Sequence, residues 1–293
     1  MARTARIKTK EEIAVLRACG RHLASTLREV VQAARPGVST LHLDAIAERL
    51  IRACGGDPVF KGYRISEARS AFPASICVSI NDEVVHGIPS GKKILQKGDI
   101  VGLDIGMRWP ASAQATAGKP ADRNHESLQE NKFPAGQVGI RNDGKGMITD
   151  MAVTIGIGDI SEEAGRLLRV TRESLDIGIA VVKPGGHVGD IGHAIQKHLE
   201  KEHLGIIRDL GGHGVGHELH EEPMIANVGM RGTGPELREG MVIAIEPMAT
   251  LGTWRITLDR DEWTFRTADG SLAAHFEHTL AVTSTGAEVL TDL

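Results

Sequence analysis

Five side chains that can bind a metal ion stand in short apolar or glycine-rich segments, where a soluble fold has little other use for them. They are Asp104, Asp150, His213, Glu246 and Glu277. Asp104 and Asp150 each lie inside a run of apolar residues that is typical of a buried strand. A carboxylate in such a strand costs free energy unless a cation or hydrogen bonds compensate its charge. These two residues therefore favour a metal site.

The other three candidates have comparable settings. His213 is flanked by glycines in Gly211–Gly216, which allow backbone and ligand to approach closely, and Glu246 and Glu277 follow apolar runs. Taken singly, each candidate has a plainer explanation, because a strand-end aspartate often caps a turn and a loop histidine often satisfies itself by hydrogen bonding. A shared metal site explains all of them together.

The composition of this set predicts the chemistry. Four carboxylates and one imidazole favour oxygen-preferring divalent ions such as Mn²⁺ or Fe²⁺, and they carry too much charge for a single structural zinc. Two ions fit better, because two carboxylates can bridge ions about 3.5 Å apart and lower the pKa of a bridging water. The resulting hydroxide attacks carbonyl groups, so the set predicts a hydrolase. Ligand type alone leaves Mn, Fe, Co and Zn open.

Two similar series of elements surround these residues. Helices are predicted from Thr9 to about Pro36 and from Ser39 to Gly55, and strands at 75–80, 99–105 and 147–157. The second half begins with a helix that Asp159 and Glu162 would cap, and Lys183–Gly185 ends it as Arg35–Gly37 ends the first helix. We therefore predict a single catalytic domain, residues 1–293, with internal two-fold pseudo-symmetry and a site between the halves.

One stretch, at about 108–144, departs from this plan. It is polar, rich in Ala, Pro, Gly, Asn and Gln, and poor in large apolar residues. We predict an insertion, which separates Asp104 from Asp150 widely. Such a long loop serves either as a linker-like excursion or as a lid over the site. A contact with the ribosome or another partner would add to catalysis and not replace it.

Bulk properties narrow the cellular setting. The chain has 293 residues and a net charge of −4, which argues against a broad nucleic-acid surface. Its three cysteines offer neither a disulfide framework nor a paired zinc motif. The sequence contains no pattern of a signal peptide or membrane span. We expect a cytoplasmic monomer without a membrane partner or a specific nucleic-acid partner.

The motifs around these residues resemble a known family. They are, in order, Val84–Pro89, Gly211–Gly216, His220–Pro223, Ile245–Met248 and Phe276–Thr279. They are similar to the signature segments of type I methionine aminopeptidases and cover nearly the whole chain outside the insertion. The resemblance implies an α+β pita-bread fold, with a pseudo-two-fold antiparallel sheet flanked by helices around a dinuclear metal site. It also implies that N-terminal (initiator) methionine is removed from nascent proteins and peptides when the second residue is small.

The resemblance gives each metal candidate a place. Asp104, Asp150 and Glu277 would hold one ion, with Asp150 and Glu277 bridging to the other. His213 and Glu246 would complete the shell of that second ion, and Glu246 would also handle protons during catalysis. The implied cofactor is two divalent ions per chain, of Mn, Fe, Co or Zn.

Further residues gain a role only through the resemblance. His86 would assist the tetrahedral intermediate and His220 would hydrogen-bond the scissile peptide, although either one alone would more often be a surface or packing histidine. The pocket for the methionine side chain would be lined by Phe72, Cys77, Leu219 and Trp263. As isolated residues, these four would pass for ordinary core.

Two alternatives stay open. A proline-directed aminopeptidase or prolidase shares the fold and the ligand set, but it usually carries a further N-terminal domain, for which too few residues precede His86. A non-catalytic pita-bread protein that only binds a partner is the other alternative. It has no reason to keep buried carboxylates that need cations. Assays of substrate cleavage and of metal content separate the three.

Overall fold

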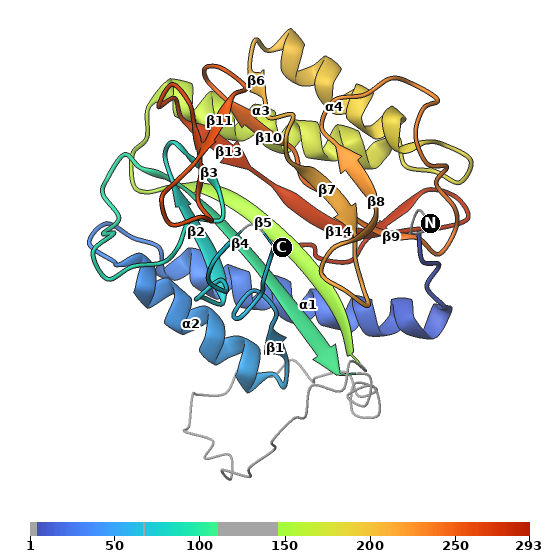
Figure 1. Ribbon diagram of the computed structural model, residues 1–293, viewed down its shortest axis with the longest axis horizontal. Helices are drawn as coiled ribbons and strands as arrows, with labels where there is room; N and C mark the ends of the chain where they lie inside the picture. The colour runs from blue at the N-terminus through green and yellow to red at the C-terminus, as the bar shows by residue number, and fades with distance from the viewer. Residues whose placement is uncertain (1–4, 67, 111–145) are drawn as a thin grey trace, which may run out of the picture.

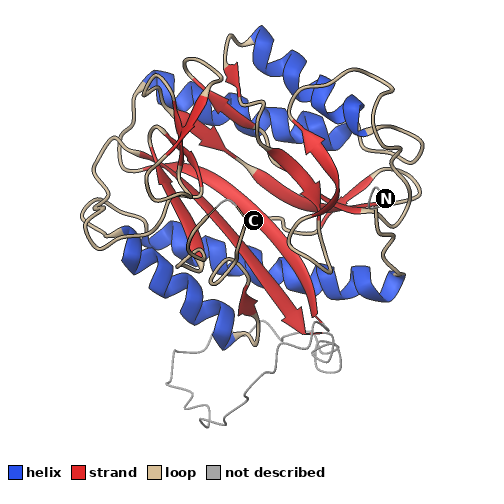
Figure 2. Cartoon of the chain, viewed as in Figure 1, coloured by secondary structure: helices blue, strands red, loops and turns tan. Residues whose placement is uncertain are grey.

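The structure is a computed structural model that describes residues 5–66, 68–110 and 146–293. Figures 1 and 2 show antiparallel strands with two pairs of helices packed along them, which is the α+β arrangement that the sequence predicts. The helices are α1 (Lys10–Ala33), α2 (Thr40–Ala53), α3 (Glu162–Ala180) and α4 (Val188–Lys201). The strands are β1 (Asp57–Pro58), β2 (Ile76–Ile80), β3 (Glu83–Val85), β4 (Ile100–Pro110), β5 (Gly146–Gly156), β6 (Gly205–Ile206), β7 (Gly211–Gly214), β8 (Glu221–Ala226), β9 (Val242–Ile245), β10 (Met248–Thr250), β11 (Ile256–Leu258), β12 (Phe265–Thr267), β13 (Ala273–His275), β14 (Glu277–Val282) and β15 (Ala287–Val289).

The start of α1 is confirmed and the cap of α3 is corrected. Thr9 and Glu12 form the predicted capping box, in which each side chain accepts the backbone N–H of the other residue. In α3 the cap is Ser161, whose hydroxyl accepts the N–H of Ala164 at 3.1 Å. Asp159 instead forms an ion pair with Lys97 at 2.6 Å. The prediction of Asp159 as the cap was therefore wrong. Both Asp159 and Ser161 are suitable cap residues by type, and the local sequence does not distinguish them.

A nine-stranded sheet forms the centre of the molecule. Its main path runs β1-β4-β5-β14-β9-β7-β8, with β2 on β4 and β15 on β14, and every pairing is antiparallel. Strands β4 and β5 pair along their whole length, from Ile100 opposite Gly156 to Pro110 opposite Gly146. Strands β4 and β5 therefore form a regular hairpin, although a long stretch of sequence separates them. Positions 108–110 of the proposed insertion belong to β4, and the rest of it lies outside the described residues.

The two halves repeat the same local structure. After α1, the N–H of Gly37 donates to the carbonyl of Leu95 at 2.8 Å, and after α3 the N–H of Gly185 donates to that of Leu237 at 2.9 Å. Both glycines have a positive φ, which suits the residue that follows a helix-ending proline. In Figure 1, α1 and α2 lie along one half of the sheet and α3 and α4 along the other. The predicted pseudo-symmetry is thus visible in the hydrogen bonds.

A small sheet of β11, β12 and β3 joins segments that are distant in sequence. It sets the loop after β3, which carries His86, beside the loop between β11 and β12, which carries Trp263. A second small sheet, β13-β10-β6, packs against α3 and α4. The first of these sheets is therefore the element that brings two predicted site segments together.

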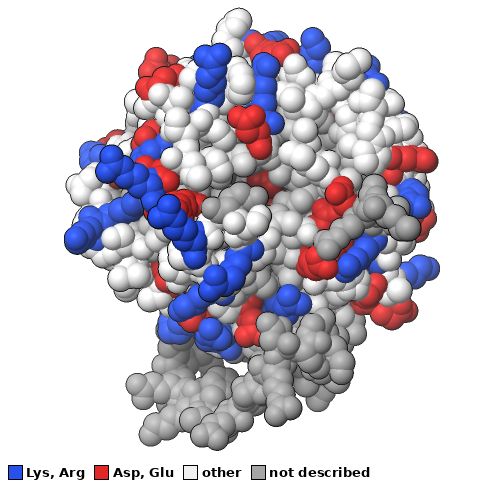
Figure 3. Space-filling view, in the orientation of Figure 1, with Lys and Arg blue, Asp and Glu red and all other residues white. Residues whose placement is uncertain are grey.

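The helices and the surface charge add little information about function. Among the described residues, no helix combines the length and apolar composition that crossing a membrane requires. On the face drawn in Figure 3, Lys and Arg side chains lie among Asp and Glu side chains. That face therefore has mixed charge.

Candidate active site

The strand register places three predicted ligands on one face of the sheet. Asp104 of β4 and Glu277 of β14 both lie opposite Ala152 of β5, one on each side. Directly opposite residues of antiparallel strands point to the same face, and so do residues two apart on one strand. Asp150, two positions before Ala152, therefore points the same way as Asp104 and Glu277.

The same argument extends to the other two candidates. Continuing the β14–β9 ladder by one residue sets Glu246 opposite Glu277. Continuing the β7–β9 pairing by one residue sets His213 opposite Ala244, two residues before Glu246. The backbone alone therefore directs all five side chains to one side of the sheet, although they come from five strands or strand ends.

The glycines around His213 are explained by close backbone approach. A Cβ atom on Gly212 would lie 2.1 Å from the carbonyl oxygen of Ala244, and one on Gly214 would lie 2.3 Å from that of Glu222. Strand β7 thus runs so near its neighbours that only hydrogen fits at these positions. His213 is the residue between them whose side chain has room, and it faces the cavity.

Distances within this cluster suit metal binding. Ligand atoms of Asp150, His213 and Glu277 all lie within 4.8 Å of one another. Nε2 of His213 is 3.9 Å from Oδ2 of Asp150 and 3.7 Å from Oε1 of Glu246. Separations of this size are too long for good hydrogen bonds, and they leave room for an ion about 2 Å from each donor.

Unpartnered oxygens also favour a cation. In the part of the chain that the structure describes, Oδ1 of Asp104, Oδ1 of Asp150 and Oε1 of Glu277 are buried and have no hydrogen-bond partner. Buried polar atoms of folded proteins are nearly always paired, and an unmet charge is costlier still. The residues present therefore fit bound divalent ions, which would compensate these oxygens.

The protonation of the carboxyl groups reflects the same crowding. Burial, and then the charge of Glu246, raise the pKa of Asp104 to about 7, against the opposing effect of His275. Burial and the neighbouring carboxylates also raise the pKa of Asp150 and that of Glu277 well above the usual range. Burial acts in the same direction on Glu246, but His275, whose Nε2 lies 3.3 Å from Oε2 of Glu246, outweighs it and lowers the pKa of Glu246. Glu246 is thus the carboxylate that keeps its charge most easily without metal.

His86 lies at the other wall of the cavity, in a left-handed backbone conformation with φ of 58°. Two hydrogen bonds hold this turn: Gly87 N–H donates to Oγ of Ser79 at 3.1 Å, and Thr264 Oγ1 donates to the His86 carbonyl at 3.4 Å. Burial lowers the pKa of His86 to about 4. Its imidazole is therefore neutral near pH 7, so one ring nitrogen can donate a hydrogen bond and the other can accept one.

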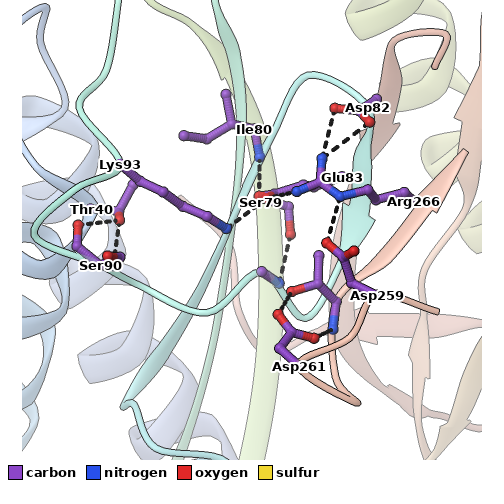
Figure 4. Close-up of polar contacts among 12 residues, drawn as sticks. Thr40, Ser79, Ile80, Asp82, Glu83, Ser90, Lys93, Asp259, Asp261 and Arg266 are labelled. Carbon is purple, nitrogen blue, oxygen red and sulfur yellow. Dashed lines mark hydrogen bonds and ion pairs between the residues drawn. The ribbon is translucent and has the colours of Figure 1, made fainter.

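A polar network around Glu83 and Arg266 (Figure 4) fixes β3, the strand that precedes His86. Oε1 of Glu83, on β3, accepts from Lys93 at 2.6 Å and from Arg266 at 2.7 Å, and Oε2 accepts the N–H of Ile80 at 2.9 Å. Arg266 also binds both oxygens of Asp82. Because Arg266 belongs to β12, the network fastens β12 to β3 and so sets Trp263 relative to His86.

His220 stands in the loop between β7 and β8, and Glu221 folds that loop. Oε1 of Glu221 accepts the N–H groups of His217 at 2.7 Å and Glu218 at 3.0 Å, and Oε2 accepts from Lys8 at 2.7 Å. The Lys8 and Glu221 side chains are 1% and 3% exposed, so the ion pair is buried. The segment before α1 therefore anchors the loop that carries His220.

A cavity of about 340 Å³ unites the site. Every residue that the sequence predicts for the site lines it: Phe72, Cys77, His86, Asp104, Asp150, His213, Leu219, His220, Glu246, Trp263 and Glu277. The acidic groups form one wall and an apolar surface the other, where the rings of Phe72 and Trp263 meet edge to face at 5.3 Å. Cys77 lies directly opposite Asp104 in the β2–β4 ladder, so its side chain belongs to the same face of the sheet as the acidic groups. Burial, and then the charge of Asp104, raise the pKa of the Cys77 thiol well above its usual value, so Cys77 adds an uncharged, polarizable group beside them.

The cavity also contains residues that the sequence analysis did not predict. They are Phe60, Tyr63, Ile65, Leu258, Glu262 and Phe265. The segment around Tyr63 lacks a recognisable motif, and Leu258 and Phe265 come from short strands whose pattern is weak. Only the proximity of Phe265 to the predicted Trp263 offered a signal.

Comparison with known proteins agrees with this geometry. The profile of metallopeptidase family M24 matches residues 14–117 and 110–284. A methionine aminopeptidase of Clostridium acetobutylicum is 41% identical over 285 residues, which are 97% of this chain and 98% of that protein. Methionine aminopeptidase 1 of Bacillus subtilis is 40% identical over 284 residues, with the same coverage.

Solved structures give the same result. The crystal structure of methionine aminopeptidase from Thermotoga maritima matches with a TM-score of 0.83 and 38% identity, covering 99% of this chain and 100% of that one. A prolidase from Pyrococcus horikoshii matches with a TM-score of 0.67 but only 18% identity, and 63% of its chain is covered, so it shares the fold alone. The chain therefore belongs to metallopeptidase family M24 and, within it, to the methionine aminopeptidases with their pita-bread fold.

Proposed function

We propose that this protein removes the N-terminal methionine from nascent proteins and peptides, preferring a small second residue, with the help of two divalent metal ions. One observation carries the proposal: five side chains of types that can bind metal point to one face of the sheet and line a single cavity together with apolar residues. Such a cavity can hold a thioether side chain on one side and a peptide bond beside the metal ligands on the other.

The residues divide the work as follows. Asp104, Asp150 and Glu277 would hold one ion, Asp150 and Glu277 would bridge, and His213 and Glu246 would hold the other. When bound, the ions supply a water of lowered pKa and polarise the carbonyl of the first peptide bond. Oxygen ligands allow Mn, Fe, Co or Zn.

The chain's own groups orient the substrate and move protons. Glu246 remains ionised, so it can accept a proton from water and deliver it to the departing amine. His86 would stabilise the tetrahedral oxyanion and His220 would hydrogen-bond the scissile peptide. Phe72, Cys77, Leu219 and Trp263 would enclose the methionine side chain. A small second residue of the substrate would leave space beside His86 and His220.

The setting follows from the substrate. Nascent chains carry N-terminal methionine where translation occurs, so we propose action in the cytoplasm, on chains near or at the ribosome. Every candidate site residue comes from one chain, so a monomer suffices. We retain the proposal of one catalytic domain over 1–293 with an insertion at about 108–144. Deleting the insertion should spare activity on short peptides if it only contacts a partner.

Release of free methionine tests the function. The chelated protein is reloaded with Mn²⁺ or Co²⁺ and incubated with the peptides Met-Ala-Ser and Ala-Pro-Ala. The parent should release methionine only with metal, and the Asp104→Asn, Glu277→Gln double variant should not. A control with two surface carboxyl groups removed, Asp159→Asn and Glu163→Gln, should behave as the parent.

Other outcomes favour the alternatives. Cleavage only before proline would point to the proline-directed branch, whose likeness here is confined to the fold. A folded, metal-loaded protein that cleaves neither peptide would contradict the enzyme, and a folded protein that retains no metal would favour a partner-binding role.

A further inference from the structure

Tyr63, the only tyrosine of the chain, contacts His220 across the cavity. Its hydroxyl oxygen lies 2.7 Å from Nδ1 of His220, and the two rings meet at a centroid distance of 5.4 Å. The His220 ring also contacts that of His213, with centroids 4.4 Å apart. His220 therefore stands between a candidate metal ligand from β7 and a phenol from the other half of the molecule.

The backbone fixes the position of Tyr63. Phe72 N–H donates to the Tyr63 carbonyl at 2.9 Å, and Gly62 N–H donates to the Phe72 carbonyl at 2.8 Å. Tyr63 N–H donates to the carbonyl of Phe60 at 2.9 Å. The same backbone pairing that holds Phe72 at the apolar wall thus holds the phenol against His220.

The contact matters because His220 is otherwise loosely held. Its side chain is exposed to the open side of the cavity. Among the described residues, Tyr63 is the one hydrogen-bond partner of its imidazole. A side chain on a loop with a single polar partner takes its orientation from that partner.

The contact also links the tautomer of His220 to the direction of its hydrogen bond with Tyr63. A neutral imidazole carries one proton, and the partner of one nitrogen decides whether the other bears it. Burial, and then the charge of Glu218, raise the pKa of Tyr63, so its hydroxyl is uncharged near neutral pH and can donate to Nδ1 or accept from it. A phenol that donates to Nδ1 leaves the imidazole proton on Nε2. Because the two nitrogens point in divergent directions, this N–H is directed away from Tyr63.

We propose that Tyr63 is a positioning residue that holds His220 as its Nε2–H tautomer, ready to donate a hydrogen bond to the first peptide bond of a bound peptide. The inference rests on the proposed function for its substrate, but the contact itself does not. Tyr63 acts through His220 and touches no reacting atom.

A double-mutant cycle tests the kinetic consequence. Tyr63→Phe removes the hydroxyl and keeps the ring, and on Met-Ala-Ser it should lower kcat about three- to tenfold while KM changes less than about twofold. In a His220→Gln background the same substitution should have no further effect, because its target is gone. An equal loss in both backgrounds, or an unchanged kcat in Tyr63→Phe, would overturn the proposal.

A spectroscopic measurement tests the tautomer without any assay of activity. Protein labelled with ¹⁵N at histidine and loaded with diamagnetic Zn²⁺ should show His220 protonated at Nε2, with His220→Gln identifying the signal. Tyr63→Phe should shift that signal toward a mixture of tautomers. A proton on Nδ1 in the parent, or identical signals in parent and variant, would refute the role of Tyr63. If the parent released no methionine, the proposed function would be contradicted. The tautomer measurement would then still test the role of Tyr63 independently.

Discussion

The two walls of the cavity are positioned by different physical means. The sheet wall, made of Asp104, Asp150, His213, Glu246 and Glu277, is set by strand register, and three of its buried oxygens have no hydrogen-bond partner among the described residues. The loop wall, made of His86, His220, Tyr63 and Trp263, is set by side-chain contacts such as those of Glu83, Glu221 and Tyr63. The sheet wall is held by its backbone and needs cations to compensate its carboxylates. The loop wall needs its polar side-chain partners to stay in position.

This difference predicts which substitutions remove metal and activity and which reduce stability or turnover. A substitution in the sheet wall should remove metal and activity but spare the fold, because the backbone ladder remains. A substitution among the contacts that hold the loop wall should cost stability or turnover while the metal stays bound. Three variants test the contrast, beginning with the largest expected effect.

Glu277→Gln should abolish most activity without harming the metal-free fold. Loss of a bridging carboxylate removes several kcal/mol of transition-state stabilisation, which corresponds to a fall in kcat/KM of about a thousandfold. Without metal the variant should melt no lower than the parent, since Gln replaces a buried carboxyl whose ionisation is costly. Metal content, kinetics and melting temperature decide this, with Asp159→Asn as the surface control. A Glu277→Gln protein that keeps metal and turnover would remove the basis for the sheet wall as a metal site.

Lys8→Met should destabilise the loop wall. It leaves Glu221 buried without its cation, which typically costs about 3 kcal/mol in the free energy of unfolding. The metal should remain bound, while kcat falls because the loop carrying His220 is less well held. Urea unfolding of the parent and variant measures the change.

Arg6→Met is the matched control for Lys8. It breaks the ion pair between Arg6 and Glu218, whose side chains are 50% and 48% exposed, and such exposed pairs contribute at most about 1 kcal/mol. If Lys8→Met proved as stable as Arg6→Met, the segment before α1 would have no special part in holding the loop.

The smallest effect concerns the opposite face of the same strand as Glu277. His278 is buried and its Nδ1 lies 3.2 Å from Oγ1 of Thr291, so this polar group is satisfied without metal. Burial, and then Arg172, lower the pKa of His278 to about 4, below its usual value near 6.5. The folded protein thus favours the neutral ring. The stability this gives is complete above about pH 6.5 and is lost as the pH falls toward 4.

His278→Gln should remove that part of the pH dependence, because Gln can still reach Thr291 and does not titrate. Melting temperatures of metal-free parent and variant should therefore lie close together near pH 7 and separate toward pH 4, where the parent loses stability and the variant does not. Parallel curves would show that His278 titrates normally in the folded state.

Much of the site could be predicted because chemistry is local in sequence. His213 among glycines, and Glu246 and Glu277 after apolar runs, have settings that a single pass along the chain reveals. Their convergence depends on Asp104 and Glu277 pairing on either side of β5, which periodicity cannot give. The resemblance to a family supplied that step, and the cavity agrees with it.

The missed features are all contacts between distant segments. Tyr63 meets His220 only when the halves come together, and no motif marks it. Strand β4 continues through Trp109 where composition predicted an insertion, and the Trp109 ring stacks on His22 of α1 at 4.3 Å. Asp159 is a good cap by residue type, but in the structure it pairs with Lys97 and Ser161 caps α3. Tertiary contacts overrode local preference in each case.

A crystal of the protein grown with Mn²⁺ tests the central claim most directly. The account predicts two anomalous peaks about 3.5 Å apart on the sheet face. Both should be bound by Asp150 and Glu277, one also by Asp104 and the other by His213 and Glu246. A well-ordered site without manganese, or peaks held by other residues while these carboxylates stay unpaired, would contradict it.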